Sequence, residues 1–150
     1  MAVPTSSRYL PIRDAICDLL AAAPALSEVK AIERDAEAFR NLPASMYPAL
    51  GVFFAEQPGV ERAQWVGGRH DHSYRLDVHV AVRSAESARA CEDQLFCYVE
   101  AVEDALRGSP LLGGLVRNMA VGVVRRWQDR SAPYWQAEAV VAVVCEKRTP

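Results

Sequence analysis

The 150-residue sequence lacks the features of a membrane or secreted protein. No apolar run approaches the roughly 20 residues that a helix needs to cross a bilayer. The first ten residues contain Pro4, three hydroxyl residues and Arg8 and have no apolar core, so we expect no secretory signal. We therefore expect the chain to be made and used in a cytoplasm and to have no membrane partner.

The sequence also has little cysteine, and its cysteines are not spaced for a metal or redox site. None of the four, Cys17, Cys91, Cys97 and Cys145, forms a C-x-x-C pair. Each lies beside apolar residues within a periodic segment. We therefore expect reduced, buried thiols at all four positions.

Catalytic and nucleotide-binding motifs are missing as well. The sequence has no G-x-S-x-G elbow, and its glycine pairs at 67–68 and 113–114 lack the Lys-Ser/Thr of a phosphate-binding loop. Glu100, Glu103 and Asp104 fall on the outer face of a predicted helix, which is typical of a solvated carboxylate run. We therefore expect no catalytic residue, no cofactor and no enzymatic activity.

One cluster has residue types that suit a metal ion, and strand geometry argues against it. It comprises His70, Asp71, His72, Asp77 and His79. Side chains alternate between the two faces of a strand, so Asp71, Asp77 and His79 would point away from the other two histidines. We expect a polar hairpin tip and no metal site.

Composition indicates one ordinary globular domain, residues 1–150, with 51% hydrophobic and 24% charged residues. The net charge of −2 and the pI near 5.9 argue against a dedicated duplex-DNA binder, which usually has a basic surplus.

The chain is organised around residues 115–148, where two long runs alternate with the period of a strand. We expect a polar connection at residues 128–133. In the first run, Met119, Val121, Val123, Arg125 and Trp127 would share one face. In the second, one face is predicted to carry the alternate residues Trp135, Ala137, Ala139, Val141, Val143 and Cys145. Both faces are apolar at mid-strand, so both should be at least partly covered.

Other elements follow from periodicity and turn residues. We expect a helix after Ser6 or Ser7, a weak strand at 28–34, a short helical turn at 35–42 and a buried strand at 50–55. A hairpin pairs 60–66 with 71–83 across a Gly67-Gly68 turn. A long helix then runs from Ala85 to Arg107, capped by Ser84 or Ser87. The predicted fold is α+β, with a mixed, mainly antiparallel sheet on which one long and one shorter helix pack.

Charge divides unevenly between the predicted long helix and the terminal strands. Residues 84–107 hold six acids against two arginines, whereas residues 115–148 hold six basic residues against three acids. Opposite charges on one small chain suit internal pairing as well as self-association.

Three readings stay open for the basic and aromatic group Arg125, Arg126, Trp127 and Arg130. It could stack on nucleic acid, or it could anchor a protein interface, where both residue types are enriched. It could also be a strand end whose arginines stay solvated while Trp127 packs on the helix.

The element order and three stretches resemble the tail terminator (tail completion) proteins of long-tailed bacteriophages. The stretches are Tyr47-Pro48-Ala49-Leu50-Gly51-Val52-Phe53-Phe54, Tyr74-Arg75-Leu76-Asp77-Val78-His79-Val80 and Ala139-Val140-Val141-Ala142-Val143-Val144. The resemblance implies a virion protein of the tail or neck, assembled in the host cytoplasm as a homohexameric ring. Its implied partners are the tail tube protein and the head-tail connector, with double-stranded DNA only passing through the lumen.

A closed ring needs two complementary patches on each subunit. We expect these two patches on the acidic long helix and on the basic pair of terminal strands. The candidate interface residues are Trp65, Arg69, Glu92, Glu100, Glu103, Arg117, Arg125, Arg126, Trp127, Asp129 and Arg130. Two alternatives remain: another neck, connector or tail-tube-like subunit, and a ferredoxin-like small-molecule-binding domain or enzyme.

Overall fold

The computed structural model describes residues 4, 7, 9–55, 64–66 and 69–149. Five strands form a mixed sheet in the order β1-β2-β4-β6-β5, and a sixth, β3, pairs with β4. The strands are β1 (Ala31–Glu33), β2 (Ala49–Phe54), β3 (Gln64–Val66), β4 (Arg69–Ser84), β5 (Asn118–Ser131) and β6 (Tyr134–Thr149). Only β1 and β2 run parallel among these pairs. The prediction of an α+β fold with a mainly antiparallel sheet is confirmed.

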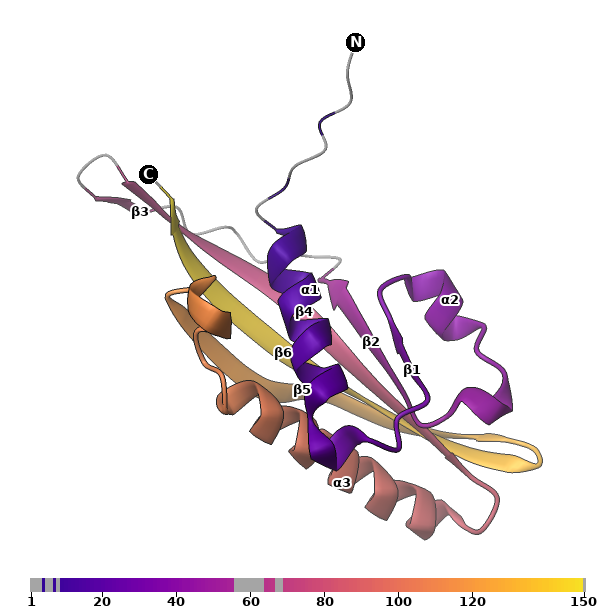
Figure 1. The fold of residues 1–150 in the computed structure, drawn as a ribbon. Coiled ribbons are helices and arrows are strands. Elements are labelled where there is room, and N and C mark those ends of the chain that lie inside the picture. The colour runs from indigo at the N-terminus through magenta and orange to yellow at the C-terminus, as the bar shows by residue number, and fades with distance from the viewer. Residues whose placement is uncertain (1–3, 5–6, 8, 56–63, 67–68, 150) are drawn as a thin grey trace.

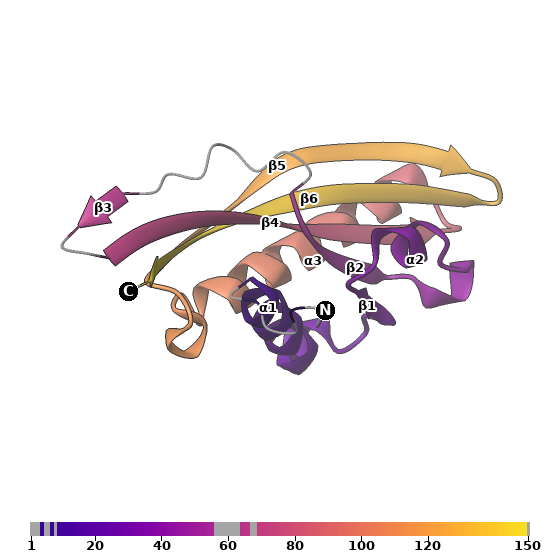
Figure 2. The ribbon, with the colours of Figure 1, turned by 90° about the horizontal axis from the view of Figure 1, so that it is seen from above.

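Two helices cover one face of this sheet (Figure 1). The shorter, α1, spans Leu10–Ala22, and the longer, α3, spans Ala88–Arg107. Ser87 caps α3, because its side-chain oxygen accepts a hydrogen bond from the backbone N–H of Ala90 at 3.0 Å. Both helices lie on the same side of the curved sheet in Figure 2. No helix among the described residues combines the length and apolar character that membrane crossing requires.

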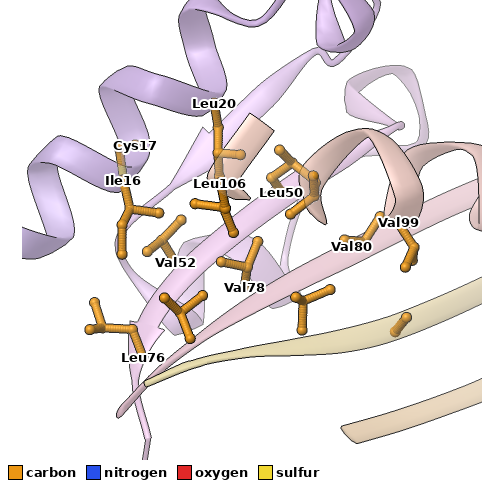
Figure 3. Close-up of a cluster of buried hydrophobic side chains, with 14 of the residues drawn as sticks. Ile16, Cys17, Leu20, Leu50, Val52, Leu76, Val78, Val80, Val99 and Leu106 are labelled. Atoms are coloured by element: carbon orange, nitrogen blue, oxygen red, sulfur yellow. The ribbon is translucent and has the colours of Figure 1, made fainter. Parts of the chain in front are cut away.

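The core lies between these helices and the sheet (Figure 3). Leu20 of α1 and Leu106 of α3 are fully buried against Leu50 and Val52 of β2 and the alternate residues of β4 and β6. The side chains of β4 and β6 that face the helices are buried and are those that alternation predicts: Tyr74, Leu76, Val78, Val80 and Val82, and Ala137, Ala139, Val141, Val143 and Cys145. Burial of these side chains is the main stabilising contribution to the fold.

A small second cluster lies on the opposite face, at one end of the sheet. The short helix α2 (Ala36–Arg40) places Phe39 over Ala49 of β2 and Ala81 of β4. Asp35 caps α2 by accepting a hydrogen bond from the backbone N–H of Glu37. The three short 3-10 helices are η1 (Pro24–Leu26), η2 (Ala44–Met46) and η3 (Leu112–Gly114). Among the described helices, α2 alone packs on this face, which we call the open face.

Three sequence predictions are wrong: the connection at 128–133, the burial of Cys97 and the faces of β5. Residues 128–131 are not a connection but continue β5, where they pair with residues 134–137 and leave Ala132-Pro133 as the turn. Cys97 is exposed on α3, whereas Cys17, Cys91 and Cys145 are buried as expected.

The predicted hairpin is described only in part. The Gly67-Gly68 turn and residues 60–63 lie outside the described residues, and β3 and β4 pair as the hairpin requires.

The third correction concerns which side chains share a face of β5. The ladder with β6 steps from Val123 opposite Val141 to Arg125 opposite Val140, so Val124 is an extra residue in a β-bulge. Arg125 and Trp127 therefore lie on the open face, and not with Met119, Val121 and Val123 on the helix-covered face. A single inserted residue moves every later side chain to the other side of the sheet.

Candidate protein interface

The open face carries a groove of about 890 Å³ between α2 and β5. Its floor includes Val140 of β6, which is 6% exposed. Strands β2, β4, β5 and β6 all contribute to the walls, so residues distant in the chain meet there. Such a groove is typical of a binding surface for another molecule.

Aromatic side chains form the end of the groove near α2. The rings of Phe39, Phe53 and His79 lie in mutual contact, with centroids 5.1 to 5.9 Å apart. Gly51 of β2 makes this packing possible, because a Cβ at that position would collide with the Phe53 ring and lie 3.1 Å from Phe39. His79 and Asp77 share the open face, as predicted.

The structure describes two side chains of the predicted histidine and aspartate cluster, those of Asp77 and His79. Asp77 accepts a hydrogen bond from the Arg75 guanidinium at 3.0 Å, and His79 lies among the aromatic rings. The side chains of His70, Asp71 and His72 lie outside the described part of the chain. Within the described part, no group of three or more potential ligands is arranged to hold a metal ion.

A polar chain crosses the groove between β4 and β6. The Arg83 guanidinium donates to Gln136 Oε1 at 3.0 Å, and Gln136 Nε2 donates to Glu138 Oε1 at 2.6 Å. Burial raises the pKa of the Glu138 carboxyl, and the charge of Asp129 adds to the rise. The hydrogen bond from Gln136 and the charges of Arg83 and Arg125 oppose it.

Arginine side chains stack on aromatic rings at two places in the lining of the groove. Arg83 lies 4.3 Å from the ring centroid of Tyr47, and Arg125 lies 4.7 Å from that of Trp127. Such stacking keeps a guanidinium partly ordered at the surface while its donors stay available. Trp127 does not pack on the long helix, as one sequence reading supposed, because the bulge turns it to the open face.

On the helix-covered side, β5 is tied to α3. Arg126 pairs with Glu92 of α3 at 2.5 Å and lies 4.8 Å from the ring centroid of Phe96. Gln128 Nε2 donates to the backbone carbonyl of Ala88 at 2.8 Å. Part of the opposite charge on the helix and the terminal strands is therefore paired within one chain.

The other candidate interface residues are spread over the surface. Arg130 stacks on Trp135 at 4.9 Å, and Glu103 pairs with Arg107 within α3 at 2.8 Å. Three more are exposed: Glu100 on α3, Asp129 on β5 and Arg117 just before β5. The side chains of Trp65 and Arg69 lie outside the described residues. The structure thus brings Arg125, Trp127 and Asp129 to the open face and Arg126, Arg130 and Glu92 to the other.

Sequence reasoning missed most of the groove. Phe39, Phe53, Arg83, Gln136 and Glu138 line it, and none was among the candidate interface residues. Alternation of β4 and β6 does predict that Arg83, Gln136 and Glu138 lie opposite the core. The groove itself could not be predicted, because α2 and the bulged β5 enclose these residues through contacts that no local sequence pattern encodes.

Comparison with known proteins finds structural likeness at low sequence identity. No family model matches the sequence, and no curated protein matches it. Among solved structures, the chain is similar to a chain of the virion of a native gene transfer agent particle. The TM-score is 0.39 and the sequence identity 11%, over 90% of this chain and 94% of the other. No residue role is transferred from this likeness.

Proposed function

We propose that this protein is a structural protein of a virion and acts as a tail terminator. In this role a ring of identical subunits, six by the resemblance, caps the tail tube, stops its polymerisation and joins it to the head connector. The resemblance of the sequence supplies the family, and the order of helices and strands agrees with what that resemblance implies. The role consists of binding and involves no catalytic step.

The observation that carries the proposal is the outer edge of β5. This strand of 14 residues ends the sheet, and no described strand pairs with its outer side. Val123 and Val124, on its two faces, are 47% and 54% exposed. A long edge strand with apolar side chains is a template for association with another chain. Closure of a ring would cover this edge in every copy.

The experiment is a tube-assembly reaction with the tail tube protein from the same genome. We expect the purified chain to shorten the tubes and to form a ring at their ends in electron micrographs. Native mass spectrometry gives the number of copies, for which we expect six. Val124→Lys, which puts a charge on the β5 edge, should abolish both effects, whereas Asp18→Arg on the exposed side of α1 should not.

The outcomes separate the alternatives. Rings that leave tube length unchanged would contradict the terminator role and favour another neck or tail-tube-like subunit. A protein that stays monomeric with the tube protein present would contradict the proposal as a whole.

A second candidate is a small-molecule-binding domain, and the groove is the observation that favours it. Arg83, Gln136 and Glu138 converge there beside aromatic rings, as polar groups do in ligand sites. Under this reading the chain stays monomeric, and a small ligand that binds in the groove raises its melting temperature.

A further inference from the structure

The groove has a chemical character that limits what can occupy it. Four arginines line it, Arg40, Arg75, Arg83 and Arg125, against two acids, Asp77 and Glu138. Arg75 is paired with Asp77 within the lining, so the positive surplus that an occupant would meet comes from Arg83 and Arg125 beside the single acid Glu138. At the aromatic end Phe39 is buried, and Phe53, which is partly exposed, offers apolar surface. A matching occupant would carry carboxylates together with at least one large apolar side chain.

The outer face of α3 has this composition. Asp93, Phe96, Cys97, Glu100 and Asp104 recur at intervals of three and four residues, so they form one stripe along the helix. All five are exposed, and Phe96 is 43% exposed although it is a large apolar residue. Asp93 and Glu100 lie about one turn on either side of Phe96, and Asp104 lies one turn beyond Glu100. Arg126 of the same chain lies over one face of the Phe96 ring, so the other face is the one that a partner would contact. Its charge and apolar content complement the groove.

The two surfaces lie on opposite sides of the subunit. The groove is on the open face, and α3 covers the other face of the same sheet (Figure 2). One copy therefore cannot satisfy its own groove with its own α3. Two copies can meet back to front, and a back-to-front contact is heterologous, which closes into a ring when the rotation between copies allows it.

We propose that the groove receives the outer stripe of α3 from a second copy of this chain. Phe96 would pack at the aromatic end against Phe53, which is partly exposed. Glu100 and its neighbouring carboxylates would face Arg83 and Arg125, whose stacking on Tyr47 and Trp127 holds their guanidinium groups at the rim. The inference rests on the proposed ring and specifies which two surfaces make its contact. It also explains how the edge of β5, which borders the groove, becomes covered.

Charge reversal tests the contact directly. Arg125→Glu and Glu100→Arg should each weaken self-association at least tenfold, measured by analytical ultracentrifugation or native mass spectrometry. The double variant R125E/E100R should recover most of the loss, because the exchanged charges again face each other across the interface. Lys30→Glu, at an exposed residue just before β1, and Asp18→Arg, on α1, serve as matched charge-reversal controls and should leave association unchanged.

Cross-linking provides a second measurement that does not depend on affinity. Cys97 is an exposed thiol in the α3 stripe. In the variant Arg125→Cys, a short bis-maleimide should link Cys97 of one copy to the new thiol of the next and give a ladder up to the full ring. In Lys30→Cys, which places the new thiol away from the groove, the ladder should be absent.

The results distinguish this inference from the terminator role. Rings that cap tubes, with no cross-link from Cys97 and no recovery in the double variant, would overturn the inference and leave the role standing. The same follows if Arg125→Glu loses binding of the tube protein while its rings persist, since the groove then holds another protein. If wild-type protein remains monomeric beside the tube protein and the Arg125→Cys variant gives no cross-link, both are overturned.

Discussion

The guanidinium of Arg126 lies 2.5 Å from a carboxylate oxygen of Glu92, a residue 34 positions earlier in the chain. This ion pair joins the edge strand β5 to the long helix α3. Both side chains are partly exposed, at 46% and 42%. The pair marks where β5 meets α3, but it contributes little to the free energy of folding, because solvent screens charges at such positions.

A double-mutant cycle should measure a small coupling for this pair. With Arg126→Ala, Glu92→Ala and the double variant, we expect a coupling energy of about 0.2–1 kcal/mol in urea unfolding. Raising the salt concentration should reduce it further. A coupling well above this range would show that the pair is desolvated in solution, contrary to its exposure in the structure.

Truncation in the core should be far more costly than truncation at the surface. Leu106→Ala removes a fully buried side chain from α3, so we expect the free energy of unfolding to fall by about 2–5 kcal/mol. Leu111→Ala is the matched control, since Leu111 is 49% exposed and its loss should cost less than about 0.5 kcal/mol. Equal losses for the two variants would contradict the assigned core.

Stability should depend on pH through Glu138. Burial raises the pKa of its carboxyl above the usual 4.5, so the folded state holds this proton more tightly than the unfolded chain. Its contribution is therefore fully present below pH 4.5 and is lost as the pH rises through the folded-state pKa. Between pH 4.5 and the folded-state pKa, the free energy of unfolding of the wild type should fall relative to that of Glu138→Gln. Above the folded-state pKa, the difference between the two free energies should stay constant.

Urea unfolding at a series of pH values measures this difference. Glu86→Gln, a change of the same kind at an exposed residue outside the proposed contact, corrects for the altered net charge. A wild type that gains stability relative to Glu138→Gln over the same window would show that the groove favours the ionised carboxylate.

Thiol labelling should separate one cysteine from the other three. In the folded monomer Cys97 is exposed and should react within the time of mixing. Cys17, Cys91 and Cys145 are buried and should react only after unfolding, and burial also raises the pKa of the Cys145 thiol to about 12. Mass spectrometry after maleimide treatment counts the adducts. Cys97→Ser should show none under native conditions, and rapid labelling of a second site would contradict the assigned burial.

Sequence patterns predicted the elements whose faces are enforced by burial. Strands β4 and β6 lie in the middle of the sheet, so every second side chain must be apolar, and their alternation shows this. The buried face of α3, from Cys91 to Leu106, was predicted for the same reason. The polar end of β5 was mistaken for a connection because an edge strand can be polar on both faces and still pair with its neighbour.

The candidate interface was predicted only in part. Arg125 and Trp127 were singled out by residue type, and the structure places them beside the groove. Their face was wrong, because the two adjacent valines at 123 and 124 give no sign of which is the inserted residue. Phe39 and Phe53 were missed because their role depends on how α2 folds back over β2.

The bulge at Val124 determines which side of the molecule displays the arginine and tryptophan of β5. Deleting that one residue would restore strict alternation and carry Arg125 and Trp127 to the α3 side, while Arg126 would leave Glu92 for the opposite side. Few substitutions of single side chains could exchange so much surface at once. The deletion of one codon here would therefore exchange the side chains that the two faces of β5 present to a binding partner, and it would leave the buried core of β4 and β6 unchanged.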